Sequence, residues 1–253
     1  MTEIFERLKE DLSALDRKAI FALVYSAFGL SSIYYLKNAE LLANAARGTT
    51  FERFGEYVAY SPASNLPALG YWVAIVTIFY FVLPAATVRF VYKEPLSGYG
   101  LALATENGFW KLLAACTAVM LPLVYLVSLT SGFTNKYPFL QIRNGDPYIG
   151  WTLVVWELIY FVQFFGLEFF FRGFLVHSLK PALGKYAIFV MTVPYCMIHF
   201  GKPPAETFAA IFAGVFLGWL SYRSGSILLG LILHCAVAFA MDILALNNKG
   251  LLF

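Results

Sequence analysis

Long apolar segments separated by short polar turns dominate the pattern of hydrophobic and polar positions along the 253-residue chain. A helix needs about 20 mostly apolar residues to cross the hydrocarbon core of a bilayer. Segments that reach this length, or nearly so, lie at residues 19–36, 67–88, 110–130, 150–176, 185–200, 206–222 and 226–246. The fifth is the shortest and contains Pro194, which predicts a kink or a break. The pattern therefore predicts an all-α, polytopic integral membrane bundle of about seven transmembrane helices.

The composition supports a membrane protein. Hydrophobic residues make up 60% of the chain and charged residues 13%, whereas a soluble domain carries about 25% charged residues. Hydrocarbon replaces the polar surface that water would demand, so the lipid bilayer is the expected surrounding. The formal charge of +3 is too small and too dispersed to indicate a nucleic-acid partner. Cys116, Cys196 and Cys235 lie in apolar segments without metal-ligand spacing, which indicates buried thiols.

The first twenty residues are polar and show no cleavable signal peptide. Their apolar side chains share one helical stripe, so they form either a short helix at the membrane surface or a solvated leader. With the N-terminus in the cytosol, ten Lys and Arg side chains fall inside and seven outside, Arg172 being left out as intramembrane. The positive-inside rule therefore favours a cytosolic N-terminus, and we expect the cell (inner) membrane.

Four ionisable side chains lie inside predicted spans, where each costs roughly 2.5–3.5 kcal/mol. They are Glu168, Arg172, His199 and His234. Glu168 precedes Arg172 by four residues, which is the favourable order for an acid and a base on one helix face. The pair is either a structural ion pair that orients the fourth helix or part of a buried polar cavity.

The spacing about Gly184 favours the cavity. If the fourth and fifth helices form an antiparallel hairpin around Gly184, Glu168 and His199 lie at equal depth, about 23 Å from the turn. His234 lies roughly 15 Å beyond the next cytosolic turn. The three groups converge if the first hairpin extends further into the cytosol.

Two other ionisable residues are expected outside this layer. His177 faces the other side of its helix from Glu168 and is expected at the cytosolic surface. Glu157 faces the same way as Glu168 but about 16 Å further out. It either lines the same cavity or reaches the outer interface, and we expect the second.

The converging groups are suited to hydrolysis. A glutamate beside a histidine can deprotonate a water, and a second histidine can polarise a carbonyl as an oxyanion forms. Glu168, His199 and His234 could instead ligate a divalent metal such as zinc and leave an open position for water. Nothing in the sequence requires a cofactor, and the HExxH signature of soluble zinc proteases is absent.

Three segments resemble the motifs of a known family. They read LEFFFRGFL, YCMIHF and FAGVFLGWLSYRSGSILLGLILH. They are similar to the motifs of the CPBP group, the CAAX-type and bacteriocin-processing intramembrane proteases also called the Abi family. On this resemblance we divide the chain into an N-terminal part, 1–95, with an interfacial helix and two transmembrane helices, and a catalytic core, 96–247.

The resemblance implies a hydrolase, an intramembrane endopeptidase that cleaves a membrane-associated peptide or protein, CAAX-like or other. The catalytic residues that it implies are Glu168, Arg172, His199 and His234. Tyr195 opens the second motif, where the family has phenylalanine, and is a candidate for substrate binding.

Two positions depart from the family pattern. Leu167 replaces the first glutamate of E-E-x-x-x-R, which activates water in the family, and Ala238 replaces an asparagine that helps to form the oxyanion site. Three functions therefore stay open. The chain is an active peptidase that uses Glu168, a catalytically inactive relative that binds or protects a membrane partner as an immunity protein does, or a proton or ion pathway.

Gly214 and Gly218 lie four residues apart in the sixth segment. Small residues at this spacing let two membrane helices approach closely. The sequence therefore predicts a close helix–helix contact at these two positions.

Overall fold

The computed structural model describes residues 4–6, 13, 15–103 and 107–252. In these residues the elements are, in order, α2 (Arg17–Leu36), α3 (Ala39–Ala46), α4 (Glu52–Tyr60), α5 (Leu66–Thr77), η1 (Ile78–Val82), α6 (Leu83–Ala86), η2 (Thr87–Tyr92), η3 (Leu96–Tyr99), α7 (Phe109–Ser128), α8 (Ser131–Lys136), α9 (Trp151–Glu168), η4 (Phe169–Leu175), α10 (Val176–Leu183), α11 (Tyr186–Met197), α12 (Pro204–Ser224) and α13 (Leu228–Asn248). The elements η1, η2 and η4 are π-helical, and η3 is a short 3-10 helix. The described residues form no strand, only isolated β-bridges.

The predicted all-helical membrane bundle is confirmed. Among the described residues, the helices long and apolar enough to cross a membrane are α2, the continuous stretch Leu66–Tyr92, α7, the continuous stretch Trp151–Leu183, α12 and α13. The fifth predicted segment is the shorter apolar helix α11 of 12 residues, which contains Pro194 and ends three residues after it. Each predicted segment therefore corresponds to a helix, and the fifth is the shortest, as expected.

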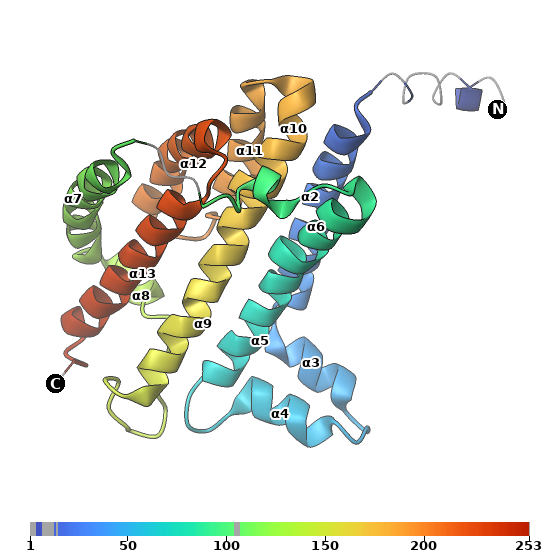
Figure 1. Ribbon diagram of the computed structural model, residues 1–253. Coiled ribbons are helices and arrows are strands. Elements are labelled where there is room, and N and C mark those ends of the chain that lie inside the picture. Colours follow the sequence, from blue (N-terminus) through green and yellow to red (C-terminus); the bar gives the residue numbers. More distant parts are fainter. Residues whose placement is uncertain (1–3, 7–12, 14, 104–106, 253) are drawn as a thin grey trace.

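The long helices run side by side, and α9 lies between α5 and α13, which both pack against it (Figure 1). The short helices α3 and α4 lie across the end of the bundle opposite the α10–α11 turn (Figure 1). The apolar pattern did not distinguish these two helices, because each is too short to cross a bilayer. The surface helix expected near the N-terminus falls largely on residues 1–3, 7–12 and 14, which lie outside the described residues.

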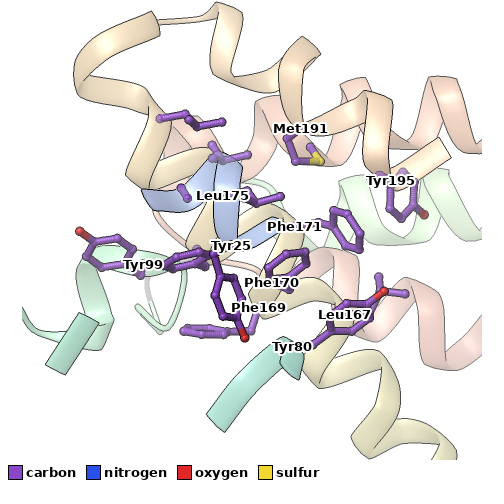
Figure 2. Packing of buried hydrophobic residues seen from close by; sticks show 14 of the residues in the cluster. Tyr25, Tyr80, Tyr99, Leu167, Phe169, Phe170, Phe171, Leu175, Met191 and Tyr195 are labelled. Carbon is purple, nitrogen blue, oxygen red and sulfur yellow. The ribbon is translucent and has the colours of Figure 1, made fainter. Parts of the chain in front are cut away.

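Aromatic side chains from η4 form the centre of the bundle. Phe169, Phe170 and Phe171 are fully buried, and Figure 2 shows them between Tyr25, Tyr80 and Tyr195. The Tyr80 ring stacks on Phe170 with centroids 4.9 Å apart. A π-helical turn is wider than an α-helical turn and often marks a functional site. This packed aromatic cluster fixes the wide turn that begins directly after Glu168.

The predicted contact at Gly214 and Gly218 is confirmed. A Cβ atom on Gly214 would lie 2.8 Å from the Thr192 side chain, and one on Gly218 would lie 2.7 Å from the end of Met191. Both partners belong to α11, so α11 and α12 approach closely along this face. The two glycines thereby fix α11, which carries Tyr195.

The segment before α7 ties η4 to the start of α13. Gly100 has a φ of +86° and its carbonyl accepts a hydrogen bond of 2.9 Å from the Ile227 amide. A Cβ atom on Gly173 would lie 2.4 Å from the Tyr99 carbonyl oxygen, so the two backbones touch. These contacts fix the position of α13 along its axis relative to η4.

An exposed ion pair holds the same segment to α2. Lys18 donates to Glu94, and the Tyr99 hydroxyl donates to the same carboxylate at 2.5 Å. Both side chains of the ion pair are about one-third exposed. The hydrogen bonds from Lys18 and Tyr99 lower the pKa of the Glu94 carboxyl group below its usual range.

Candidate active site

Glu168 is the last residue of α9 and lies at the centre of a buried charged cluster. Its Oε1 atom is 3.2 Å from Arg172 Nη1 and 2.7 Å from His234 Nδ1. Glu168 and Arg172 are fully buried, whereas the His234 side chain is 18% exposed. The i, i+4 pairing expected from the sequence is therefore present, and α13 adds a third group to it.

The cluster retains unused hydrogen-bonding capacity. Both carboxylate oxygens of Glu168, the guanidinium nitrogens of Arg172 and Nδ1 of His234 are buried and make no contact with hydrogen-bond geometry. The three groups are thus held together by charge at contact distances. A purely structural buried ion pair needs these extra hydrogen bonds to offset its desolvation. The unsatisfied atoms are what a site prepared for water or substrate would contain.

Tyr195 connects the cluster to α11. Its hydroxyl is 3.2 Å from His234 Nε2, and its ring lies 3.7 Å from the Arg172 guanidinium carbon. This cation–π contact supports the charge on the fully buried Arg172. On its other side, His234 stacks on Phe164 with centroids 5.4 Å apart and planes at 6°. Tyr195 therefore contacts two of the predicted catalytic residues.

His199 lies beside this cluster but touches it only through Tyr195. The chain reverses at Gly184, and α11 packs back on η4 and α10, as the hairpin prediction requires (Figure 1). His199 Nδ1 donates to the Tyr195 carbonyl at 2.9 Å, and the two rings meet edge to face at 4.9 Å. Among the described residues, the ion pairs of Glu168 are with Arg172 and His234 and not with His199. Tyr195 thus occupies the position between the acid and this histidine.

Gly230 makes room for the Glu168 carboxylate, a role that the sequence analysis missed. A Cβ atom on Gly230 would lie 2.4 Å from Glu168 Oε2 and 2.9 Å from its carboxylate carbon. The available signal was the spacing, since Gly230 is one helical turn before His234 on the same face.

A cavity extends from Glu168 and Gly230 toward the turn between α12 and α13. Most of its wall is apolar, and the lining side chains come from α7, α12, α13 and that turn: Phe109, Leu112, Leu217, Leu220, Ser224, Ser226, Ile227 and Leu229. Because Oε1 faces Arg172 and His234, Oε2 is the carboxylate oxygen that lies closest to Gly230. The cavity therefore lies beside an otherwise enclosed carboxylate.

The backbone at Arg172 is fixed from α12. Ser221 Oγ donates to the Arg172 carbonyl at 2.9 Å, and His177 Nε2 is 3.3 Å from the same hydroxyl. His177 stays outside the cluster, as expected, but it is half-buried against α12 and not at the surface. The wide π-helical turn explains the difference, because it leaves a carbonyl for Ser221, which in turn binds His177.

The two positions that depart from the family motifs contribute no polar group. Leu167 is 5% exposed and packs in the aromatic core (Figure 2). Ala238 is 3% exposed and packs in an apolar cluster with Trp156 and Tyr160. Glu168 is therefore the carboxylate that helix α9 brings to His234.

Glu157 does not reach the outer interface, so that expectation was wrong. It is 6% exposed and lies within hydrogen-bonding range of Asp242 on α13, which is 1% exposed. Trp156 Nε1 also donates to Asp242 Oδ2 at 2.6 Å. Asp242 was not among the residues expected from the sequence, although an acid inside the segment 226–246 was a visible signal. The partner on α13 keeps Glu157 inside the bundle.

The predicted metal ligands do not form a metal site in this arrangement. Among the described residues, no group of three or more His, Cys, Asp and Glu side chains could hold a metal ion. His234 has Nδ1 against Glu168 and Nε2 against the Tyr195 hydroxyl, so neither nitrogen is free to coordinate. His199 is separated from both by Tyr195. The three residues therefore do not fit a shared zinc ion as they are placed here.

Comparison with known families supports the motif resemblance. Residues 149–240 match the family model of the type II CAAX prenyl endopeptidase Rce1-like proteins. No curated protein and no solved structure matches the chain. The matched segment begins just before α9, ends within α13 and contains Glu168, Arg172, Tyr195, His199 and His234. Residues 149–240 of this integral membrane protein are therefore similar to the Rce1-like type II CAAX prenyl endopeptidases.

Proposed function

We propose that the protein is an intramembrane endopeptidase that hydrolyses a peptide bond of a membrane-associated protein, CAAX-like or other. The observation that carries this proposal is the buried carboxylate of Glu168, which has unsatisfied oxygens, lies 2.7 Å from His234 and borders a cavity. A carboxylate in this setting can act as a general base.

Glu168 would activate the water. A water held at the Gly230 end of the cavity would lie next to Oε2, which would take its proton while the hydroxide adds to the scissile carbonyl carbon. The proton then passes to the amine as the carbon–nitrogen bond breaks. Arg172 keeps Glu168 ionised before the reaction and fixes its rotamer.

The Tyr195 hydroxyl, which His234 holds through Nε2, would turn to the oxyanion and stabilise it. Ala238 has no side-chain donor, but the Tyr195 hydroxyl lies 3.2 Å from His234 Nε2. Donors directed at a developing oxyanion typically contribute 10²–10³-fold in rate. The hydroxyl of Tyr195 would thus replace the donor that the family has at position 238. Tyr195 would also hold His199 through its carbonyl oxygen.

The substrate would enter from the cytosolic side. We propose that the protein lies in the cell (inner) membrane with its N-terminus in the cytosol. In this orientation the turn between α12 and α13 faces the cytosol. The cavity reaches this turn at Ser224 and Ser226, and its wall is mostly apolar. A metal ion is not needed for these steps.

An inactive relative that binds a membrane partner is the second candidate. The burial of Leu167 and Ala238 in apolar clusters favours it, because both positions have lost the polar group that the family uses there. The retained cluster around Glu168 would then serve only to hold α9 and α13 together.

Turnover of a peptide library by the purified protein tests both candidates. The library contains membrane-protein segments with free and lipidated C-terminal cysteines, each assayed with and without a chelator. We expect cleavage that survives the chelator and is lost in Glu168→Gln, which keeps the size of the side chain. Absence of cleavage in the wild type, or equal cleavage by Glu168→Gln, would contradict the peptidase proposal. Loss of cleavage with the chelator would mean that the reaction uses a metal.

A further inference from the structure

Glu157 and Asp242 form a second polar contact between α9 and α13 that the proposed function does not use. Both side chains lie at least nine-tenths buried, in a part of the bundle lined by aromatic rings. Both oxygens of Glu157 and Oδ1 of Asp242 are buried and without a hydrogen-bond partner. Two ionised carboxylates accept hydrogen bonds and cannot donate them. Their close approach therefore needs a ligand that carries positive charge.

The groups around the pair supply no such charge. Tyr160 on α9, Cys235 on α13, and Tyr137 and Glu206 at the neighbouring helix ends are the titratable groups that face it. Glu206 already binds Lys202 at 2.6 Å and Tyr137 at 2.8 Å. Lys202 is thus paired with another acid, and among the ion pairs of the described residues none joins a base to Glu157 or Asp242.

Asp242 is the better ionised partner. Trp156 Nε1 donates to its Oδ2 at 2.6 Å, and a donor at this distance stabilises a carboxylate. Glu157 has no such donor. Like charges at contact distance in a buried site cannot both ionise. We propose that Glu157 and Asp242 bind one proton between them, carried by Glu157 and donated to Asp242, and that this proton joins the outer halves of α9 and α13.

Loss of the proton leaves two negative charges on Glu157 and Asp242, and their repulsion separates α9 from α13 at these residues. Because Glu168 and His234 lie on the same two helices, the proton site also bears on the geometry of the candidate active site. The inference does not depend on peptidase activity, since it concerns the binding of a proton and the packing of α9 against α13.

Infrared spectroscopy of the purified protein in detergent tests the proposal. At neutral pH we expect the carbonyl band of one protonated, buried carboxylic acid. Glu157→Gln should abolish this band, whereas Asp242→Asn should keep it at a shifted frequency because the acceptor changes from a carboxylate to an amide. Glu168→Gln is the matched control on the same helix and should leave the band in place, since Arg172 and His234 keep Glu168 ionised. A wild type without the band, or a band that survives Glu157→Gln, overturns the proposal.

Thermal unfolding provides a second measurement that does not need the band to be resolved. The wild type should lose stability as the pH is raised and the proton leaves, and Glu157→Gln should lose this dependence because its amide donates to Asp242 at any pH. At fixed neutral pH, replacing choline by Na⁺ or Ca²⁺ should not change the melting temperature. A rise with either metal ion would show that a metal cation, and not a proton, occupies the pair. A loss of thermal stability at alkaline pH that is equally large in Glu157→Gln would also contradict the proposal.

Discussion

Helices α9 and α13 are joined by two polar contacts of opposite kinds. Near the middle of the bundle, Glu168 meets His234 at 2.7 Å and has Arg172 beside it. Eleven residues earlier on α9, about 16 Å away, Glu157 meets Asp242, eight residues after His234 on α13. The first contact joins an acid to bases, and the second joins an acid to an acid. We refer to them below as the inner bridge and the outer bridge.

The difference between the two bridges shows that the neighbour of a buried acid decides whether the acid is ionised or neutral. An acid placed beside a guanidinium can stay ionised without water, and an ionised carboxylate is a base. An acid placed beside another acid can be buried only with a proton or a cation, and so it is neutral and holds two helices together. The inner bridge borders a cavity, whereas the outer bridge packs among Trp156 and Tyr160. A cavity therefore accompanies the bridge that has an ionised acid.

Removing the cation from the inner bridge should have the largest effect. Arg172→Ala leaves Glu168 buried without its guanidinium and should cost about 3–5 kcal/mol of stability, with loss of turnover. Denaturant unfolding in mixed micelles measures the first and peptide cleavage the second. Arg172→Lys is the control, because it keeps the charge. Equal stability of Arg172→Ala and the wild type would show that the inner bridge does not need its base.

Gly230→Ala tests whether the inner bridge needs free space at Oε2. The new Cβ atom would lie 2.4 Å from that oxygen and should displace the carboxylate, and misplacement by about 1 Å can cost about 10²-fold in turnover. Gly70→Ala in α5 is a matched control, since nothing lies within 4 Å of its Cβ position. Cleavage assays at equal folded concentration measure the effect. An unchanged rate in Gly230→Ala would place the reacting water elsewhere.

Gly218→Leu separates loss of packing from loss of charge. Gly218 faces Met191 on α11 and touches neither bridge. The larger side chain should lower the yield of folded protein and cost about 1–3 kcal/mol by overpacking. Gel filtration in detergent and thermal unfolding measure both. If stability is unchanged, this face of α12 meets lipid and not α11.

The exposed pair of Lys18 and Glu94 should show the smallest effect. Hydrogen bonds from Lys18 and Tyr99 hold the pKa of Glu94 below its value in the unfolded chain. The pair therefore stabilises the fold at a pH above the unfolded pKa, and this stabilisation is lost as the pH falls through the folded pKa. With the side chains about one-third exposed, solvent and salt reduce the gain to at most about 1 kcal/mol. The difference in melting temperature between wild type and Glu94→Gln should therefore shrink in acid. A difference that grows in acid would contradict this assignment.

The fold followed from the apolar pattern because segment length is a strong constraint in a bilayer. The pattern located each spanning helix and the short α11, and the glycine spacing located the contact of α11 with α12. It did not reveal α3 and α4, because short helices at the end of a bundle leave no long apolar run. It also gave no sign of the π-helical turns, which depend on how the aromatic side chains of η4 pack.

The candidate site was only partly predictable. The i, i+4 spacing gave Glu168 with Arg172, and symmetry about Gly184 gave the depth of His199. Depth does not determine which way a side chain faces, however, and Tyr195 took the place between Glu168 and His199. The space at Gly230 and the outer bridge depend on the register of α13 against α9. A single sequence does not give that register, because it follows from contacts between helices distant in the chain.

The central claim is that Glu168 of the inner bridge is the working base, whereas Glu157 of the outer bridge serves packing. Turnover of one cleavable peptide by Glu168→Gln and Glu157→Gln, compared side by side at neutral pH, tests it most directly. Both changes replace a buried glutamate of α9 by an amide of equal size. We expect Glu168→Gln to lose about 10²–10⁴-fold in rate and Glu157→Gln to remain close to wild type, since its amide still donates to Asp242. Equal rates in the two variants, or a larger loss in Glu157→Gln, would contradict the account.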